Sequence, residues 1–366
     1  MGETELRKGD HIKICLEKDV SARITKTGFD DVHLIHTSLP EMAATDIDLS
    51  INFFGKKLSA PILIEAMTGG TKRSKKINSF LASAAESLGI AMGVGSQRVA
   101  IENPELIDTF KVVREKAPNT FLIANIGAAQ LAKGFSLREA KMAIDMVEAN
   151  ALAIHLNPLQ EVVQLEGETG FTAVINKIKE LSSSIGVPII VKETGAGISA
   201  ETAKKLEAAG VKCINVSGAG GTSWAAVEYY RAVKAHDIQR RHLAKAFWDW
   251  GIPTAVSIVE VSKSTSLPVI ASGGVRTGIE VAKAIALGAD LAGMALPLLK
   301  PAIIGEEKIL EVLKLLIAEL KTAMFLSGAK SIGDLKSIPL IITGFTSEWL
   351  KLRGFNTESY ARRSLR

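Results

Sequence analysis

The sequence has little cysteine and no long apolar run. Two cysteines, Cys15 and Cys213, occur in 366 residues, and thiols so far apart along the chain predict neither a disulfide framework nor a cysteine metal site. The most apolar stretch, LAGMALPLL at 291–299, is well short of the roughly 20 residues that span a membrane. The start, MGETELRKGDHIKI, contains no apolar signal region. We therefore expect a cytoplasmic protein that does not bind membranes.

Concentrated positive charge is also absent. The net charge is +5, and the densest basic cluster is TKRSKK at 71–76, which does not resemble a nucleic-acid-binding arm. A mild, dispersed charge of this kind argues against nucleic acid as a partner. It is compatible with small anionic ligands.

Eight short apolar segments recur along the chain, separated by helical patterns. They are APILIEAM (60–67), GIAMGVG (89–95), TFLIANI (120–126), ALAIHL (151–156), VPIIVKE (187–193), VKCINVS (211–217), LPVIASG (267–273) and ADLAGMA (289–295). Continuous apolar runs without strict alternation are typical of parallel strands buried on both faces. Eight β-plus-α units in series predict an α/β protein with a (β/α)8 TIM barrel. A doubly wound sheet is the alternative, but the chain shows no break in composition.

Three regions lie outside this repeat in a chain that we interpret as one domain, 1–366. Residues 1–59 form an N-terminal extension to a barrel at 60–300, and 301–366 form a C-terminal helical segment. A long insertion, 218–266, separates strands 6 and 7. Insertions of this length on a barrel are typically functional, so we interpret it as a lid.

Glycine-rich sequences follow the last strands, at the end of the barrel where active sites lie. SGAGGTSW (217–224) follows strand 6 and SGGVRTG (272–278) follows strand 7. Such glycines either make tight turns or let backbone N–H groups approach a phosphate. Lys192 ends strand 5, where it either forms a structural ion pair or stabilises negative charge on the ring of a planar cofactor. Together they predict FMN across the barrel mouth. The candidate FMN-binding residues are Met67, Thr68, Gly69, Gly70, Ser96, Asn125, Lys192, Ser217, Thr222, Gly273, Gly274, Arg276, Ala295 and Leu296.

Four polar residues follow strand 4 within HLNPLQE (155–161): His155, Asn157, Gln160 and Glu161. His155 and Asn157 are two positions apart and share a face of an extended chain, so both could donate hydrogen bonds to phosphate oxygens. Glu161 offers the carboxylate that Mg²⁺ takes together with phosphate oxygens and waters. Alternatively, His155 is a core histidine and Glu161 a solvated residue at a helix start.

The motifs RKGDH, FDDVHLIHTSLPE, MTGG, GSQR, HLNPLQE, VKETGAGIS, SGAGGTSW, WGIPT and ASGGVRTG resemble those of type 2 isopentenyl diphosphate isomerase, over about residues 6–330. HLNPLQE and GSQR are the distinctive ones. SGAGGT and SGGVRTG are shared with FMN barrels such as glutamate synthase and the 2-hydroxyacid oxidases. The resemblance implies an enzyme that depends on FMN and Mg²⁺ and interconverts isopentenyl and dimethylallyl diphosphate. It further implies a flavin kept reduced by NAD(P)H and a homo-oligomer, a tetramer or octamer.

The same resemblance suggests roles for individual residues. Arg98 in GSQR, with Arg7 and Lys8, is expected to clamp the diphosphate, because guanidinium binds phosphate bidentately. Arg7 and Lys8 are otherwise simply solvated charges. Ser96 is expected to contact flavin or substrate. Trp224 would shield a developing carbocation with its ring face, or merely pack within the lid.

The expected reaction is a 1,3-proton shift, and Gln160 is the candidate catalytic residue. An amide does not titrate in the useful range, so Gln160 needs another proton carrier, and reduced FMN is the remaining one. The runner-up function is an FMN-dependent oxidoreductase of the 2-hydroxyacid oxidase or glutamate synthase type. Such enzymes have either a cysteine in the loop after strand 6 or a histidine close after a late strand. The loops SGAGGTSW and SGGVRTG after strands 6 and 7 of this sequence contain neither, which argues against net redox chemistry. A non-catalytic phospholigand-binding barrel is a third possibility, which the polar set after strand 4 argues against.

Overall fold

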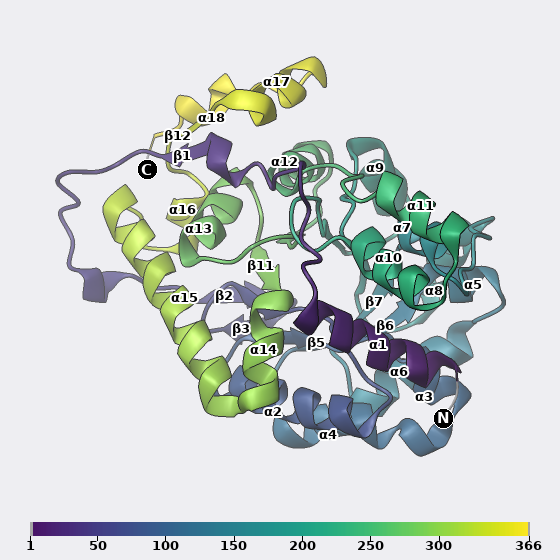
Figure 1. The fold of residues 1–366 in the computed structure, drawn as a ribbon. Helices are drawn as coiled ribbons and strands as arrows, with labels where there is room; N and C mark the ends of the chain where they lie inside the picture. Colours follow the sequence, from purple (N-terminus) through teal and green to yellow (C-terminus); the bar gives the residue numbers. More distant parts are fainter. Residues whose placement is uncertain (1–2, 365–366) are drawn as a thin grey trace.

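The computed structural model describes residues 3–364 and contains a closed barrel of eight parallel strands (Figure 1). In barrel order these are β4 (Ile62–Ile64), β5 (Ala91–Gly93), β6 (Leu122–Gly127), β7 (Ala151–His155), β8 (Ile189–Lys192), β9 (Cys213–Asn215), β10 (Val269–Ala271) and β11 (Leu291–Met294), and β11 pairs with β4 to close the ring. Each strand lies inside one of the eight apolar segments, except that β6 extends one residue beyond its segment, to Gly127. The predicted (β/α)8 barrel is thus confirmed, and the doubly wound sheet was the wrong alternative.

Alternate residues of the strands form two separate apolar cores. Leu63, Ile123, Ile190 and their neighbours pack inside the barrel, while the residues between them pack outward against the helices. The hairpin of β2 (Ile51–Phe53) and β3 (Lys56–Leu58) adds Phe53 and Leu58 to the inner cluster. Because the interior is filled by side chains at this end, a ligand can be accommodated only at the carboxyl end of the strands.

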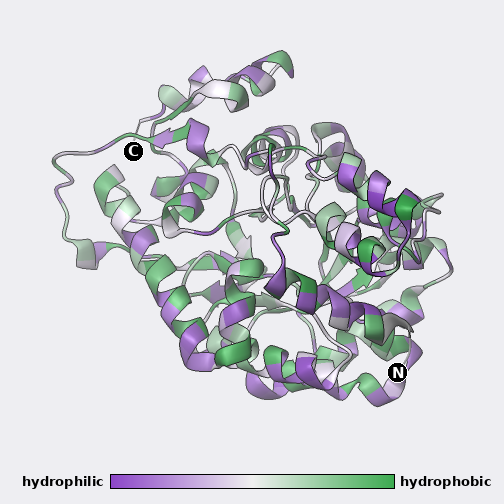
Figure 2. Ribbon diagram, in the orientation of Figure 1, coloured by the Kyte–Doolittle hydropathy of each residue, from purple (hydrophilic) through white to green (hydrophobic). Residues whose placement is uncertain are grey.

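Amphipathic helices surround the strands, and hydrophobic residues alternate with hydrophilic ones along them (Figure 2). The ring consists of α2 (Lys72–Leu88), α4 (Asp108–Lys116), α6 (Leu137–Val147), α8 (Val174–Ser184), α9 (Ala200–Ala208), α12 (Thr254–Ser264), α13 (Gly278–Leu287) and α15 (Glu306–Ser327). Helix α15 packs between α13 and α2, so it completes the ring. The sequence-based division had placed it beyond the barrel, because the helix that directly follows β11 is the shorter α14 (Leu296–Ile304).

The insertion between strands 6 and 7 is smaller than the sequence suggested. Its last helix, α12, packs against α9, α13 and β10 as an ordinary ring helix. The extra elements are α10 (Trp224–Lys234) and α11 (Ile238–Ala246), which contact each other and α7 (Pro158–Val163) at the carboxyl end of β7. The lid function of this pair remains a prediction.

The N-terminal extension contributes to both sides of the molecule. Helix α1 (Glu3–Glu17) lies beside α10 and α14 at the mouth of the barrel (Figure 1). Further along, β1 (Val32–Leu34) pairs antiparallel with β12 (Leu340–Ile342). The remaining short elements are η1 (Phe29–Asp31), η2 (Ala44–Asp46), α3 (Arg98–Glu102), η3 (Pro104–Leu106), α5 (Ala128–Ala132), α16 (Ile332–Leu335), α17 (Gly344–Leu352) and α18 (Glu358–Ala361). Within residues 3–364, every helix is too short or too polar to cross a membrane.

The C-terminal helices are anchored to the ring by Tyr360. Its side chain is buried and its hydroxyl donates to the carbonyl oxygen of Leu287, the last residue of α13, at 3.0 Å. Tyr360→Phe should therefore lower the free energy of unfolding by about 1 kcal/mol, since a buried carbonyl loses a donor. Urea denaturation measures this. Leu352→Ala, at an 83% exposed position, is the control and should change stability by less than about 0.5 kcal/mol. Equal effects would contradict the anchoring role.

Candidate functional site

A cavity of about 270 Å³ opens at the carboxyl end of the barrel. Its wall combines α1, the exits of several strands, α7, α10 and the start of α14. Most of the predicted site residues line it: Arg7, Lys8, Met67, Thr68, Ser96, Arg98, Asn125, His155, Asn157, Gln160, Glu161, Lys192, Ser217, Thr222, Trp224, Gly273, Gly274, Arg276, Ala295 and Leu296. Residues from nearly 300 positions apart therefore face one space.

The floor of the cavity is a polar layer made by the inward-facing residues of the strands. Two positions beyond the apolar residues of the inner core lie Glu65, Asn125, His155, Lys192 and Asn215, on the same face of their strands. His155 is half-buried and the other four are buried. Lys192 Nζ lies 3.7 Å from Glu65 Oε2 and donates to the carbonyl oxygen of Glu193 at 3.0 Å. The lysine therefore has both an ion-pair partner and a position at the cavity floor.

Gly69 and Gly70, which we expect to contact FMN, are not among the residues that line the cavity, and their contact with FMN remains a prediction. A Cβ at Gly69 would overlap the ring of Phe110, and one at Gly70 would overlap Val99. The Gly70 amide donates to Thr109 Oγ1 at 2.8 Å. These glycines allow the loop after β4 to pack closely against α3 and α4, and thereby place Met67 and Thr68 at the cavity.

The two glycine loops interlock at the opposite wall. Gly273 and Gly274 have φ values of 101° and 76°, which favour glycine. A Cβ at Gly273 would overlap the backbone of Gly218, and one at Gly274 would meet Thr27 and the backbone of Gly221. Helix α13 follows, with a Thr277 N-cap. Close backbone approach next to a helix N-terminus is what a phosphate group requires, so this wall fits the tail of FMN.

The segment HLNPLQE forms the end of β7 and the first turn of α7. Asn157 Nδ2 donates to Glu161 Oε1 at 2.8 Å and to Gln160 Oε1 at 3.2 Å. Glu161 Oε2 accepts from the backbone N–H of Glu168 at 2.7 Å. Asn157 Oδ1 is buried and has no donor within the described chain. An acceptor in this state is available to a bound donor or cation.

The carboxylate of Glu161 fits a shared rather than a self-contained metal site. Among residues 3–364, no cluster of three or more histidine, cysteine, aspartate or glutamate residues is arranged to hold a metal ion. Mg²⁺ is commonly bound through one or two carboxylates together with substrate phosphates and waters. Glu161, at the edge of a cavity lined by several basic residues, can supply that carboxylate.

His155 is an uncharged imidazole in this environment. Its Nδ1 lies 2.8 Å from Asn125 Oδ1, and Asn125 Nδ2 donates to the carbonyl oxygen of Val94, so Nδ1 carries the proton. Burial, and after it the charges of Lys192 and Lys8, lowers the pKa of His155 to about 3. The neutral ring therefore presents Nε2 to its surroundings as an acceptor.

The cationic side chains of the mouth are already positioned. Lys8 Nζ donates to the carbonyl oxygen of Ser96 at 2.7 Å, and burial together with the charge of Arg7 lowers the pKa of Lys8 to about 7. Arg98 contacts Glu102 at 2.7 Å and Glu168 at 3.2 Å. Since Lys8 is unfavourably charged in this setting, an anion bound between these side chains would be stabilised.

A buried polar network lies beside Trp224, and the sequence alone did not show that its members contact one another. His11 Nε2 lies 2.8 Å from Glu228 Oε1, and Arg231 bridges Glu228 and Glu166 at 2.8 and 2.6 Å. The rings of His11 and Trp224 meet edge to face at 5.0 Å. The i, i+4 spacing of Trp224 and Glu228 places both on one helix face, but only the fold brings α1 to them.

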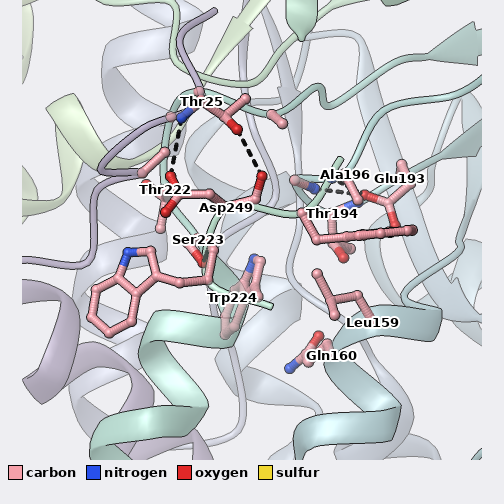
Figure 3. A pocket seen from close by; sticks show the side chains of 17 residues that line it. Thr25, Leu159, Gln160, Glu193, Thr194, Ala196, Thr222, Ser223, Trp224 and Asp249 are labelled. Carbon is pink, nitrogen blue, oxygen red and sulfur yellow. Dashed lines mark hydrogen bonds between the residues drawn. The ribbon is translucent and has the colours of Figure 1, made fainter. Parts of the chain in front are cut away.

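Figure 3 shows Gln160 and Trp224 across a smaller pocket from the loop of Glu193. Glu193 Oε2 accepts from the N–H groups of Thr194 and Gly195 at 2.6 and 2.7 Å. Burial raises the pKa of Glu193 to about 7. The loop therefore turns around this carboxyl group, and Thr194 and Gly195 reach the wall of the main cavity.

The cavity also contains residues that sequence reasoning missed, of which Glu65 is the most prominent. It lies within the apolar run APILIEAM, where a single carboxylate was the available signal. Gln130 and Gln164 are also at the cavity wall. Their positions depend on the short helices α5 and α7, which the sequence pattern did not resolve.

Comparisons with known proteins agree with this geometry. A family model described as FMN-dependent dehydrogenase matches residues 6–131 and 125–341. Proteins named isopentenyl-diphosphate delta-isomerase are similar over almost the full length: that of Methanosarcina barkeri is 51% identical, covering 98% of this chain and 97% of its own. The corresponding protein of Methanothermobacter thermautotrophicus is 50% identical, covering 98% and 99%.

Solved structures share the fold at low sequence identity. A lactate oxidase of Pediococcus acidilactici has a TM-score of 0.64 at 17% identity and covers 89% of both chains. A mandelate oxidase has a TM-score of 0.63 at 18% identity and covers 93% of this chain and 97% of its own. At these identities the likeness concerns the arrangement of the barrel and its helices.

The low pKa of His155 predicts a specific dependence of stability on pH. The unfolded chain binds a proton near pH 6.5, whereas folded His155 does so only near pH 3, so its contribution to stability is lost as the pH falls below 6.5. Glu193, with its raised pKa, acts in the opposite direction between about pH 4.5 and 7. We therefore expect His155→Asn to flatten the acid-side loss of unfolding free energy relative to the wild type, measured by urea denaturation from pH 7 to 4.5. The exposed His36→Asn should leave that slope unchanged. A slope that His155→Asn leaves unaltered would contradict the neutral assignment.

Proposed function

The chain belongs to the isopentenyl-diphosphate delta-isomerase family, within the wider family of FMN-dependent dehydrogenases, and on this premise we propose that the cavity performs a 1,3-proton shift between isopentenyl and dimethylallyl diphosphate with reduced FMN and Mg²⁺. The observation that carries this proposal is the shared cavity. The polar residues after β7, the glycine loops after β9 and β10, and the basic residues of α1 all line it. These groups would give a flavin phosphate and a diphosphate separate places in the cavity.

The chain's residues fit FMN in their chemistry. The backbone of Gly273 and Gly274, with Arg276 beside it, would hold the phosphate, and Lys192 would lie at the ring. When bound and reduced, the flavin supplies a proton carrier next to the alkene. Lys192 would stabilise negative charge at the ring edge, while Met67 and Thr68 line the adjacent wall.

The diphosphate would be bound by Arg7, Lys8 and Arg98 together with Mg²⁺ at Glu161. Arg98 would exchange part of its contact with Glu168 for phosphate oxygens, which offer guanidinium the same bidentate geometry. His155 can donate from Nε2 only when doubly protonated, and a neighbouring diphosphate favours that state. Asn157 also lines the cavity, and its Oδ1 has no donor within the described chain.

Gln160 is proposed to orient the reacting carbons. Its Oε1 accepts from Asn157 Nδ2 at 3.2 Å and its Nε2 donates to Gln164 Oε1 at 3.3 Å, so its amide has a defined direction. It is not an acid at ordinary pH, and its part is to relay or direct the proton. Trp224, with α1 and α10 around it, would exclude water from a cation-like centre.

The oxidoreductase alternative has less support. Of the histidines, His11 and His155 line the cavity, and neither comes from the strand 6 or 7 exit at which the hydroxyacid oxidases place their catalytic histidine. NAD(P)H as the reductant, a tetrameric or octameric assembly and a cytoplasmic location remain predictions that rest on the resemblance and on the sequence.

The decisive experiment follows isopentenyl diphosphate by proton NMR in D2O with FMN-loaded, chemically reduced enzyme and Mg²⁺. We expect many substrate molecules to isomerise for each reducing equivalent supplied, with deuterium entering the product, because a proton shift has no net redox change. Oxidised enzyme is the control and should be inactive. Consumption of one reductant per product would instead support an oxidoreductase.

A second prediction concerns the metal. Glu161→Gln should raise the Mg²⁺ concentration for half-maximal activity by roughly 10- to 100-fold, since a charge-assisted contact of about 1.5–3 kcal/mol is lost. FMN content, read from the absorbance of the purified protein, should not change. Glu180→Gln, an exposed carboxylate on α8, is the matched control and should leave both quantities as in the wild type. If Glu161→Gln lost flavin and Glu180→Gln did not, the residues after β7 would bind the cofactor instead of the metal.

A further inference from the structure

Glu65 is a buried carboxylate at the cavity floor that the proposed roles do not use. It is 6% exposed and follows β4 on the inward face. Its Oε2 lies 3.7 Å from Lys192 Nζ, and its Oε1 accepts from Asn215 Nδ2 at 2.5 Å. Asn215 Oδ1 accepts in turn from Ser272 Oγ at 2.6 Å. Residues at the ends of β8, β9 and β10 therefore hold one carboxylate beside one lysine.

The barrel provides space specifically for this side chain. A Cβ at Gly293, on the neighbouring strand β11, would come 2.5 Å from Glu65 Oε1. Any larger residue at this position would displace the carboxylate. Burial of a carboxylate is unfavourable unless a cation and hydrogen-bond donors compensate it, and both Lys192 and Asn215 are in place.

We propose that Glu65 is a positioning residue that sets how much of the positive charge of Lys192 acts on the flavin ring. This inference rests on the proposed FMN site. A second charge of opposite sign at 3.7 Å offsets much of the field of the lysine at a distance. Lys192 Nζ also donates to the carbonyl oxygen of Glu193. Glu65 and this carbonyl group together fix the location of the ammonium group.

The consequence lies in the balance between the two redox states of the flavin. Reduction adds negative charge to the ring, which Lys192 stabilises and Glu65 counteracts. A reduced ring that is less stabilised as an anion binds a proton more tightly. Glu65 would thereby set the proton affinity of the ring for the 1,3-shift, without contacting the substrate.

The test compares the two-electron midpoint potential of FMN-loaded wild type and Glu65→Gln, together with the affinities of the apoprotein for oxidised and reduced FMN. We expect Glu65→Gln to favour reduced over oxidised FMN by tenfold or more, equivalent to a rise of about 30 mV for a two-electron couple. Glu65→Asp retains the charge and should remain closer to the wild type. Gly293→Ala would place a Cβ 2.5 Å from Glu65 Oε1 and displace the carboxylate, so it should also change the potential and provides a second readout if Glu65→Gln folds poorly.

Glu260→Gln is the matched control. Glu260 is a carboxylate on α12 that is just as buried, but it contacts the Ala200 amide and Arg353 outside the cavity. Its loss should lower stability and leave the potential unchanged. If Glu65→Gln weakens both redox forms of FMN equally, Glu65 is a scaffold for Asn215 and the inference is wrong. If wild type binds no FMN or does not isomerise the substrate, the proposed function itself fails, whatever Glu65 does.

Discussion

The closure of eight parallel strands into a ring is the constraint on which the rest of the structure depends. Closure gives every strand one inward face. The alternate residues on that face must either fill the interior of the barrel or form the floor of the cavity above it. Leu63, Ile123 and Ile190 fill it. Two positions later Glu65, Asn125 and Lys192 end it with groups that need partners. On β4, β6 and β8 the apolar filling therefore gives way to the polar floor within two residues, and the charged groups of this floor are held by ion pairs and hydrogen bonds.

The loops above this floor are fixed by contacts with one another rather than by the strands alone. The backbone of Gly273 fits against Gly218, and Gly274 against Thr27 and Gly221. Side chains at these positions would separate the loops. A cradle built from backbone in this way keeps its N–H groups in place before any phosphate arrives, so binding requires little further ordering.

The sequence was sufficient for the barrel and for most of the cavity, and the reasons are physical. Continuous apolar runs and glycine-rich exits are local signals, so the strands and Gly273 could be predicted. Contacts between distant segments could not be predicted in this way. Gly69 and Gly70 resemble ligand-binding glycines, but they accommodate Phe110 and Val99. Helix α15 belongs to the ring because of its contacts with α13 and α2. Glu65 lies within an apolar run, and no local sequence feature indicates that its carboxylate is close to Lys192.

The placement of α1 determines when the cavity can be completed during synthesis. This helix is synthesised before α10 and α14, both of which it contacts, and α14 begins only at Leu296. The strand that follows in the same extension, β1, pairs with β12, which ends at Ile342. In a nascent chain, α1 and β1 therefore cannot complete these contacts until α14 and β12 have been made. The mouth of the barrel therefore stays open until α14 has been made, and the basic residues of α1 join a site whose other walls are already finished.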